Sequence, residues 1–321
     1  MGPAQLVDLA LEVSIVGSFG RPGYRLRRRL FGWPDPDPGS MTGQTVVLTG
    51  PTSGLGRSAA GGLAALGARI VLLGRDESRL QRVAHELRQQ HGRDEFPIVV
   101  VDMASLASVR AAVAAIGVSE SRIDVVVDSA GAINEERVIT DDGLEATFAT
   151  MVVGPYVLID GLLPQLEQSG GGRVISVVSG GMYAQALDLD DLQFEDGPFD
   201  GVRAYARAKR ASTVMVREWA RRLRGRRVRV DAMHPGWVDT PGLARSLPRF
   251  YDVVRPILRT PEEGVDTIVW LAAQAPRQAA GGRLFLDRRP RPFDRVPSTR
   301  VGAAERRRLW DLVVAASHGP F

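Results

Sequence analysis

Residues 45–56, with the sequence TVVLTGPTSGLG, join a short apolar strand to an alanine-rich helix at about 57–66 through a glycine-rich turn. Strand, glycine turn and helix in this order are what a phosphate-binding loop requires, because the free N–H groups at a helix N-terminus bind an anion. Gly50 would permit the tight turn, Gly54 would let the backbone approach a pyrophosphate, and Gly56 would let helix and strand pack closely. The stretch therefore predicts a dinucleotide-binding loop.

Apolar strands and helices keep alternating after this loop. Further strands are expected at 69–73, 97–101, 123–127, 173–178, 227–232 and 283–287, and helices at 77–90, 106–116, 141–167, 205–224 and 261–273. Crossover helices between successive strands imply parallel pairing with helices on both faces of the sheet. The sequence thus predicts an α/β fold of the Rossmann type, a doubly wound parallel sheet of about seven strands in a single domain. Such sheets bind ligands outside the carboxyl ends of their strands.

We divide the chain into three parts. The nucleotide-binding domain is expected at 42–290, with a substrate loop at 237–260 inside it. An N-terminal amphipathic helix and a Pro-rich linker are expected within 1–41, because prolines at alternate positions near 34–38 forbid both helix and sheet. An Arg-rich C-terminal extension at 291–321 should contain a helix near 303–315.

The apolar stretch 4–19 has two interpretations. It is too short, and with two acidic residues too charged, to span a bilayer. Together with the arginines at 25–29 it could lie on a membrane surface, giving a weak peripheral contact through residues 4–29. It could instead pack on the domain or on a neighbouring subunit, which is the interpretation we favour.

The composition excludes several kinds of site. The 321 residues include no cysteine, which rules out disulfides and thiolate catalysis, and the four histidines lack metal-ligand spacing, so no metal site is expected. The net charge is only +4 and no nucleic-acid-binding motif accompanies it, so no nucleic acid is expected as a partner. Most of the arginine clusters at 25–29, 221–229 and 288–308 are expected to be solvated faces. A cysteine-free chain fits a cytoplasmic location.

Lys209 is the one lysine among 41 Lys and Arg residues. A chain that otherwise uses arginine should keep a lysine only where a compact ammonium on a flexible stem is needed. Tyr205 precedes it by four positions, so both side chains would share one face of a helix. Since a nearby ammonium favours the phenolate, Lys209 is expected to lower the pKa of Tyr205. The pair predicts proton-transfer chemistry; the alternative is an ordinary helix face with a solvated lysine.

Arg75 and Asp76 follow the second expected strand and bear on the choice of cofactor. An arginine here suits the 2′-phosphate of NADP, whereas an acidic residue suits the ribose 2′-hydroxyl of NAD. Arg75 comes first and Arg57 should lie nearby, so we expect NADP(H) to be preferred over NAD(H).

The glycine loop, the Tyr205-x-x-x-Lys209 pair and the turn at His234-Pro-Gly236 resemble the short-chain dehydrogenase/reductase family over about 42–290. The resemblance implies an oxidoreductase that exchanges a hydride between NADP(H) and a carbonyl or alcohol. Tyr205 would be the general acid or base, Lys209 would activate it and hold the nicotinamide ribose, and Ser179 would hydrogen-bond the substrate oxygen.

The resemblance also implies which residues contact the cofactor. The expected set is Thr49, Gly50, Ser53, Gly54, Leu55, Gly56, Arg75, Asp102, Met103, Ala130, Gly131, Pro235, Gly236, Val238 and Thr240, together with Tyr205 and Lys209. Members of the family often form homo-oligomers through two long helices, here 141–167 and 205–224, so a homo-oligomer is expected by analogy.

Two departures from the family pattern leave a second function open. Asp128 and Ser129 replace a pair of asparagines, and Met151 replaces the helix asparagine that helps to hold a proton-relaying water. A catalytically weak nucleotide-binding sensor or scaffold with the same fold is therefore the alternative, although Lys209 favours the enzyme. The aromatic residues of the 237–260 loop suggest a hydrophobic substrate, and the alternative is that they are core or subunit contacts.

Overall fold

The computed structural model describes residues 2–275 and 281–319 and contains one eight-stranded sheet, in the order β3-β2-β1-β4-β5-β6-β7-β8. The strands are β1 Thr45–Thr49, β2 Arg69–Gly74, β3 Ile98–Val100, β4 Val125–Asp128, β5 Gly172–Val177, β6 Val228–Met233, β7 Leu284–Leu286 and β8 Arg289–Arg291. All pairs are parallel except β7 with β8, so the predicted doubly wound sheet is confirmed. The antiparallel β8 was not predicted, because Arg-Pro-Arg lacks a strand pattern and its proline fits only an edge strand.

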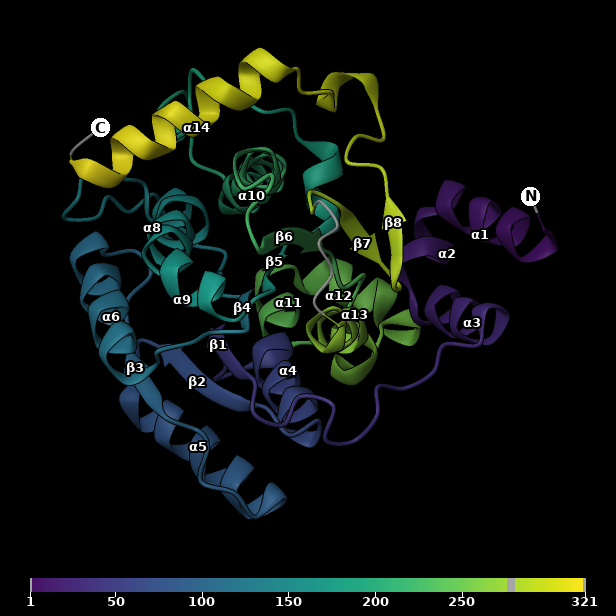
Figure 1. Cartoon of the computed structure of the whole chain (residues 1–321). Coiled ribbons are helices and arrows are strands. Elements are labelled where there is room, and N and C mark those ends of the chain that lie inside the picture. Colours follow the sequence, from purple (N-terminus) through teal and green to yellow (C-terminus); the bar gives the residue numbers. More distant parts are fainter. Residues whose placement is uncertain (1, 276–280, 320–321) are drawn as a thin grey trace.

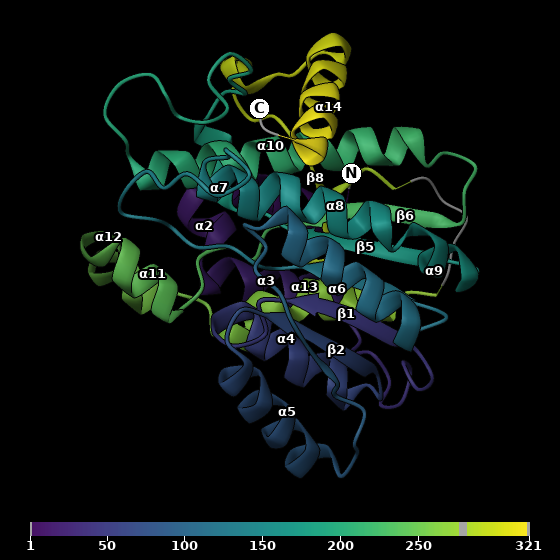
Figure 2. The same ribbon diagram turned by 90° about the vertical axis from the view of Figure 1, so that its left-hand side faces the viewer.

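Helices cover both faces of the sheet (Figures 1 and 2). The helices α4 Gly54–Ala65, α5 Glu77–His91 and α13 Pro261–Ala273 lie on one face, and α6 Leu106–Ser119, α8 Gly154–Gly161, α9 Leu163–Gln168 and α10 Gly201–Arg222 lie on the other. Strand β1 shows how the alternation of a strand divides the core: Val46 and Leu48 join the first layer and Val47 joins the second. The sheet is buried on both faces, as its apolar strands require.

The predicted helix over 141–167 is broken into several pieces. It consists of α7 Ala146–Phe148, a π-helical turn Ala149–Val153, α8 and α9. Glu145 starts it by accepting hydrogen bonds from the N–H groups of Thr147 and Phe148, both at 2.8 Å. Pro155 has no N–H to donate to the carbonyl of Met151, and Ser212 Oγ donates to that oxygen instead, at 2.7 Å. A wide turn of this kind is common at functional sites.

Three helices precede the first strand where one was expected: α1 Pro3–Val13, α2 Ile15–Phe19 and α3 Arg21–Phe31. They lie beside β7 and β8 (Figure 1). The acidic residues of α1 face inward, since Asp8 is buried, whereas Leu9 and Val13 are 54% and 82% exposed. The favoured interpretation, a helix that packs on the domain, therefore fits the acidic side of α1. The apolar side of α1 faces outward.

Some arginines of the predicted clusters are exceptions to the expected solvated faces, because they are buried against acidic residues. Arg27 is 0% exposed and its guanidinium lies between Asp8, Glu12 and Asp287, with N–O distances of 2.8, 2.7 and 2.7 Å. Arg288 and Arg291 of the third cluster are also buried. A sequence pattern cannot show that acidic residues far away in the chain will meet a cluster of this kind.

The C-terminal helix α14 Ala303–His318 lies across α8 and α10 (Figure 1). Trp310 packs edge-on against Tyr156 of α8 and Trp219 of α10, with ring centroids 5.3 and 4.7 Å away. The surfaces on which the predicted subunit contact relied are therefore occupied by a helix of the same chain. No helix in the described part of the chain is both long and apolar enough to cross a bilayer.

The substrate loop is mostly helical. It contains α11 Pro241–Ser246, α12 Pro248–Val254 and a 3₁₀ turn at Arg255–Ile257, and other 3₁₀ turns lie at Gly180–Ala184 and Pro297–Thr299. Figure 2 shows α11 and α12 projecting from the body of the molecule at the carboxyl edge of the sheet. The two ends of the loop meet in a parallel bridge between Val238 and Arg259.

Candidate active site

The glycine loop is shaped by backbone contacts that leave no room for side chains. A Cβ at Gly56 would lie 2.0 Å from the carbonyl oxygen of Gly50, so only glycine lets α4 approach β1 this closely. Gly50 has φ +69°, and a Cβ there would lie 3.1 Å from Ala130 Cα. Gly54, at φ +48°, faces Thr240, whose Cγ2 would be 3.3 Å from its Cβ. The loop thus touches the segments that follow β4 and β6.

Other residues of the expected cofactor set support this loop. The buried hydroxyl of Thr49 accepts hydrogen bonds from the N–H groups of Ser129 and Ala130, both at 2.9 Å, and so joins the ends of β1 and β4. Leu55 and Val238 both pack against Gly264 of α13. Ser53 occupies the N-cap of α4 without capping it through its side chain, which leaves its hydroxyl available to a ligand.

At the end of β2, Arg75 and Asp76 are in different situations. Arg75 is exposed. Asp76 caps α5: its Oδ1 accepts from Arg79 N at 3.0 Å and from Ser78 Oγ at 2.7 Å, and these hydrogen bonds lower its pKa. Arg57, which was expected near this position, pairs with Glu86 at 2.6 Å. Asp76 is therefore bound to helix α5 and Arg57 is paired with Glu86, whereas Arg75 is exposed at the end of β2.

The segment after β3 lies against the π-helical region. Asp102 is half-buried and its Oδ1 accepts from Ala104 N at 2.9 Å. Met103 is buried, and its carbonyl oxygen lies 2.2 Å from the point where a Cβ of Gly154 would stand. These contacts fix the position of the segment at the carboxyl edge.

The three expected catalytic residues come together from the end of β5 and from α10. Lys209 is buried, and its Nζ donates to the Val177 carbonyl at 2.8 Å and lies 5.7 Å from the Tyr205 ring centroid. A Cβ at Gly131 would be 3.6 Å from Lys209 Nζ and 2.9 Å from Met151 Sδ. Met151 thus packs beside the lysine, as its alignment with the family asparagine implied.

The expected effect of Lys209 on the phenol is not found. Burial raises the pKa of Tyr205 above its ordinary value, and a side-chain hydrogen bond with Ser179 opposes the rise. Burial also lowers the pKa of Lys209, while the charge of Asp128 opposes that shift. The prediction was wrong because it counted only the attraction between ammonium and phenolate and left out the desolvation of both groups.

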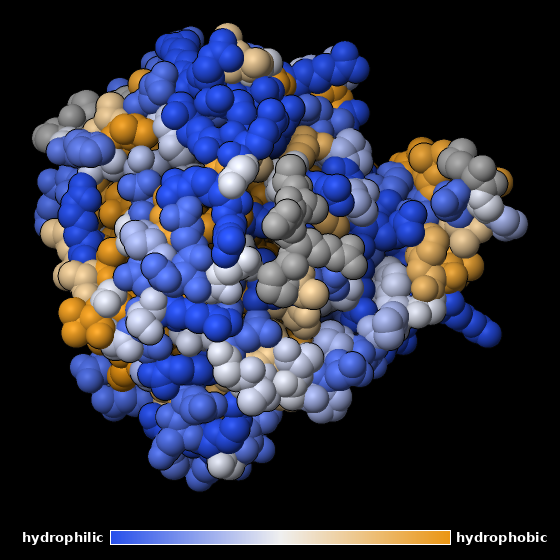
Figure 3. All heavy atoms as spheres, viewed as in Figure 1, coloured by the Kyte–Doolittle hydropathy of each residue, from blue (hydrophilic) through white to orange (hydrophobic). Residues whose placement is uncertain are grey.

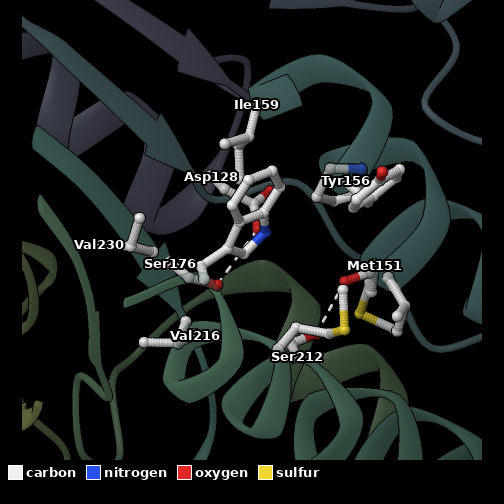
Figure 4. Close-up of a pocket in the computed structure, with 12 residues that line it drawn as sticks. Asp128, Met151, Tyr156, Ile159, Ser176, Ser212, Val216 and Val230 are labelled. Atoms are coloured by element: carbon white, nitrogen blue, oxygen red, sulfur yellow. Dashed lines mark hydrogen bonds between the residues drawn. The ribbon is translucent and has the colours of Figure 1, made fainter. Parts of the chain in front are cut away.

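Asp128 lies beside Ser176 among mostly apolar side chains (Figure 4). Ser176 Oγ donates to its Oδ2 at 3.3 Å, whereas the buried Oδ1 has no hydrogen-bond partner among the described residues. Burial raises the pKa of Asp128 to about 6. A cavity of about 20 Å³, bordered by Asp128, Ser176 and Ser212, is large enough for one water molecule.

The segment after β6 carries an aromatic cluster. His234 is buried, and burial together with neighbouring arginines, Arg259 first, lowers its pKa well below the usual value. Phe19 lies 4.8 Å from the His234 ring and 5.9 Å from Trp237, and Trp237 lies 5.2 Å from Phe250. Pro235 is buried and Gly236 has φ +77°. Sequence reasoning missed Phe19, because no local pattern places an N-terminal phenylalanine at this edge.

Within residues 2–275 and 281–319, no group of His, Asp and Glu side chains could hold a metal ion. The arrangement instead combines a glycine cradle shaped for a phosphate with a buried lysine and a tyrosine near a serine. Such a site can bind a dinucleotide and transfer a proton.

Comparisons with known proteins agree with this geometry. The sequence profile of a family described as short chain dehydrogenase matches residues 44–249. The chain is 36% identical over 283 residues to dehydrogenase/reductase SDR family member 12 of Bos taurus, covering 87% of this chain and 88% of the relative. It is 35% identical over 295 residues to retinol dehydrogenase 14 of Mus musculus, covering 86% of each.

A solved structure from Beutenbergia cavernae, assigned as an NAD(P)-dependent gluconate 5-dehydrogenase, contains NADP at low occupancy. It matches with a TM-score of 0.61 and 27% identity, over 77% of this chain and 96% of that one.

Proposed function

Because the chain belongs to the short-chain dehydrogenase/reductase family, and is thus an NAD(P)-dependent oxidoreductase acting on CH–OH or C=O groups, we propose that it is an NADP(H)-dependent reductase of a hydrophobic carbonyl compound. The observation that carries this proposal is the convergence of Tyr205, Lys209 and Ser179 beside a glycine cradle that a single Cβ would fill.

The chain's own residues supply the proton and the orientation. The bound dihydronicotinamide supplies a hydride to the carbonyl carbon. Ser179 donates a hydrogen bond to the carbonyl oxygen and holds it near Tyr205, whose hydroxyl gives that oxygen its proton, so that an alcohol forms. The Tyr205 phenol is protonated at neutral pH, as a proton donor in reduction must be, and burial raises its pKa further, which makes it a weaker acid.

Lys209 keeps one part of its expected role, the contact with the cofactor. Its ammonium is held by the Val177 carbonyl, beside Gly131 and within the field of Asp128. We propose that it binds the ribose hydroxyls of the cofactor, a contact that the family resemblance also implied.

The cofactor proposal rests on the residues after β2. Arg75 is exposed, whereas the Asp76 carboxylate accepts a hydrogen bond from the backbone of α5. A 2′-phosphate of the cofactor would therefore contact Arg75 before it reached the carboxylate. The Beutenbergia cavernae relative contains NADP. Replacing Arg75 by Ala should lower the preference for NADPH over NADH by about tenfold, which corresponds to about 1.4 kcal/mol. An unchanged ratio of the two dissociation constants would remove Arg75 from the cofactor site.

The substrate proposal rests on the aromatic residues at the mouth of the site. Trp237 and Phe250 pack edge to face at the start of the substrate loop. The mouse relative is a retinol dehydrogenase, and retinol is an apolar alcohol. We therefore propose an apolar aldehyde or ketone as the substrate class.

The test is NADPH and NADH oxidation across a panel of aldehydes and ketones of increasing apolar size. Tyr205→Phe should lose about 100-fold to 10,000-fold of kcat, the range that general acid catalysis contributes. Tyr156→Phe is the matched control, because Tyr156 is a buried tyrosine that packs under α14. Equal activity of wild type and Tyr205→Phe would overturn the assignment of the acid.

The second candidate, a nucleotide-binding sensor or scaffold, is favoured by one observation. Met151 puts a thioether where the family has an asparagine, and Asp128 is buried with one oxygen unpartnered among the described residues. A sensor would bind NADPH with wild-type affinity and oxidise it with none of the panel. Binding together with turnover would exclude it.

A peripheral membrane contact is a further part of the proposal. Leu6, Leu9, Val13, Ile15 and Val16 are all exposed on α1 and α2, and Figure 3 shows the apolar surface that gathers over these helices. We propose that this surface touches anionic lipid, since exposed arginines of α3 lie close by.

Liposome flotation of a Val13→Asp variant against a Val118→Asp control tests the contact. Val118 is 91% exposed on α6, away from α1. Loss of flotation only in Val13→Asp would support the contact, and equal flotation of both variants would remove it.

Two further points remain proposals. A homo-oligomer would need a surface other than that of α8 and α10, because α14 covers both helices. A cytoplasmic location rests on the cysteine-free composition alone.

A further inference from the structure

Phe19, at the end of α2, is packed against the backbone next to a proposed catalytic residue. It is 6% exposed, and a Cβ at Gly180 would lie 2.7 Å from its Cε2 atom. Gly180 directly follows Ser179, the residue proposed to hold the substrate oxygen. The ring of Phe19 also stacks on Tyr183, with centroids 6.4 Å apart, in the same 3₁₀ turn. The position of the Ser179 turn is therefore limited by an aromatic ring from the N-terminal segment.

The main chain of Phe19 holds both ends of the substrate loop. Its carbonyl oxygen accepts hydrogen bonds from Trp237 N and from Arg259 Nε, each at 2.9 Å. A Cβ at Gly236 would lie 2.5 Å from this same oxygen, so glycine is needed for the approach. One carbonyl thus fixes residues at the beginning and the end of 237–260.

Phe19 is itself held firmly in place. Arg259 also donates to the Ser18 carbonyl at 2.9 Å and pairs with Asp287. Asp287 pairs in turn with Arg27, which donates to the same Ser18 carbonyl at 3.0 Å. Two buried arginines from different parts of the chain therefore converge on the backbone just before Phe19.

We propose that Phe19 is a positioning residue for the substrate: through the Ser179 turn and through Trp237 it sets the width of the substrate site and so the size of carbonyl compound that binds. The inference rests on the proposed function. Phe19 contributes shape and no charge, so its loss should affect the binding of large substrates more than the chemical step or the cofactor.

The first test separates KM from kcat for the largest apolar substrate of the panel. Phe19→Leu should raise KM about tenfold, the size of effect expected when a hydrophobic contact is lost, with a smaller change in kcat and no change in the dissociation constant of NADPH. Phe19→Tyr should restore KM towards the wild-type value. Phe96→Leu is the matched control, because Phe96 is a fully buried phenylalanine in the other core layer. The same rise in KM in Phe19→Leu and Phe96→Leu would overturn the proposal.

The second test does not depend on activity. Arg245 and Arg249 are exposed trypsin sites in the substrate loop. Phe19→Ala should speed tryptic cleavage there by about tenfold, since a loop that is less firmly held opens more often, whereas Phe96→Ala should leave the rate unchanged. Equal cleavage in all three proteins would overturn the proposal even if no substrate is found, whereas a failure of NADPH binding would count only against the proposed function.

Discussion

The proposed cofactor side and the proposed substrate side of the carboxyl edge are built in different ways. On the cofactor side, glycines and a threonine bring backbone segments together, as at Gly56, where helix and strand approach so closely that a Cβ would lie 2.0 Å from the Gly50 oxygen. On the substrate side, charged side chains from the two ends of the chain hold the N-terminal helices against β7, β8 and the substrate loop. The first construction is encoded in a short motif. The second depends on residues more than 200 positions apart.

The difference teaches that one chain can shape its proposed phosphate cradle through local backbone contacts and its proposed substrate wall through ion pairs between distant residues. Asp8 and Glu12 of α1 form the acidic centre of the second construction. The basic residues that pair with one or both of them are Arg27, Arg289, Arg291 and Arg295. Arginine side chains lower the pKa of Asp8, while burial opposes them. Asp128 on the proposed cofactor side is a buried carboxylate that makes no ion pair within the described residues; burial raises its pKa, and the charge of Lys209 opposes the rise.

The largest effect should come from breaking the charged construction at its most buried residue. Arg27→Met should lower the free energy of unfolding by about 3 to 5 kcal/mol, because it leaves buried carboxylates without a partner. Arg28→Met is the control, since Arg28 lies on the same helix and its partner Asp35 is exposed, and it should cost at most about 1 kcal/mol. Urea unfolding measures the free energy of unfolding of both variants. Equal decreases would mean that the buried ion pairs do not stabilise the substrate side.

The next effect should come from a substitution that disrupts the close backbone packing at Gly56. Gly56→Ala should cost about 1 to 3 kcal/mol of overpacking and weaken NADPH binding by up to about 100-fold, because the loop must move away from α4. Gly61→Ala lies in the same helix with nothing within 4 Å of its Cβ, and it should stabilise the protein by about 0.5 to 1 kcal/mol. Urea unfolding and NADPH titration measure the two effects. If Gly56→Ala binds NADPH as tightly as Gly61→Ala, the close approach at Gly56 does not shape the cradle.

A smaller effect sharpens the contrast between the two carboxylates through pH. The pKa of Asp128 is about 6 when folded, above its unfolded value of about 4, so the folded state binds this proton more tightly. The free energy of unfolding should therefore fall as the pH rises from about 4 to 6, by up to about 3 kcal/mol, and stay lower above pH 6.

Asp128→Asn should lose this slope, whereas Asp94→Asn, at an exposed position, should keep it. Denaturant unfolding between pH 4 and 8 measures the slopes. If the free energy of unfolding of Asp128→Asn falls with pH as steeply as that of the wild type, ionising the Asp128 carboxyl costs the folded state no free energy.

The smallest effect has the opposite sign and belongs to the substrate side. Burial holds His234 neutral, with a pKa well below the usual value of about 6.5. The unfolded chain then binds a proton that the folded chain does not, so stability should fall as the pH drops below about 6.5, by at most about 1.4 kcal/mol per pH unit.

His234→Phe should remove this loss, and the exposed His85→Gln should not. Denaturant unfolding over a series of pH values measures this loss too. The pH dependence due to His234 can be separated from that due to Asp128, because each is removed by a different substitution. A loss below pH 6.5 that is the same in His234→Phe and wild type would show that another group causes it.

The same contrast explains what could be predicted from the sequence. The parallel sheet followed from regular alternation, and the spacing of Tyr205 and Lys209 placed both residues on one helix face at the site. The direction of the pKa shift of Tyr205 could not be predicted, since it depends on how deeply the tertiary fold buries the phenol. Phe19 was missed for a related reason: its neighbours come from segments that follow β5 and β6, and nothing near it in the sequence indicates them.

The ion pair between Arg27 and Asp287 has a consequence for the order in which the molecule is made. The two residues are 260 positions apart, so at 5 to 20 residues per second a ribosome needs roughly 13 to 52 seconds between them. During that time β1 to β5 are already synthesised and can pair with one another, while α3 has none of its partners from the end of the chain. The part of the proposed cradle that consists of β1, α4 and the end of β4 can therefore form early during translation, whereas the contacts of α3 with the end of the chain form last.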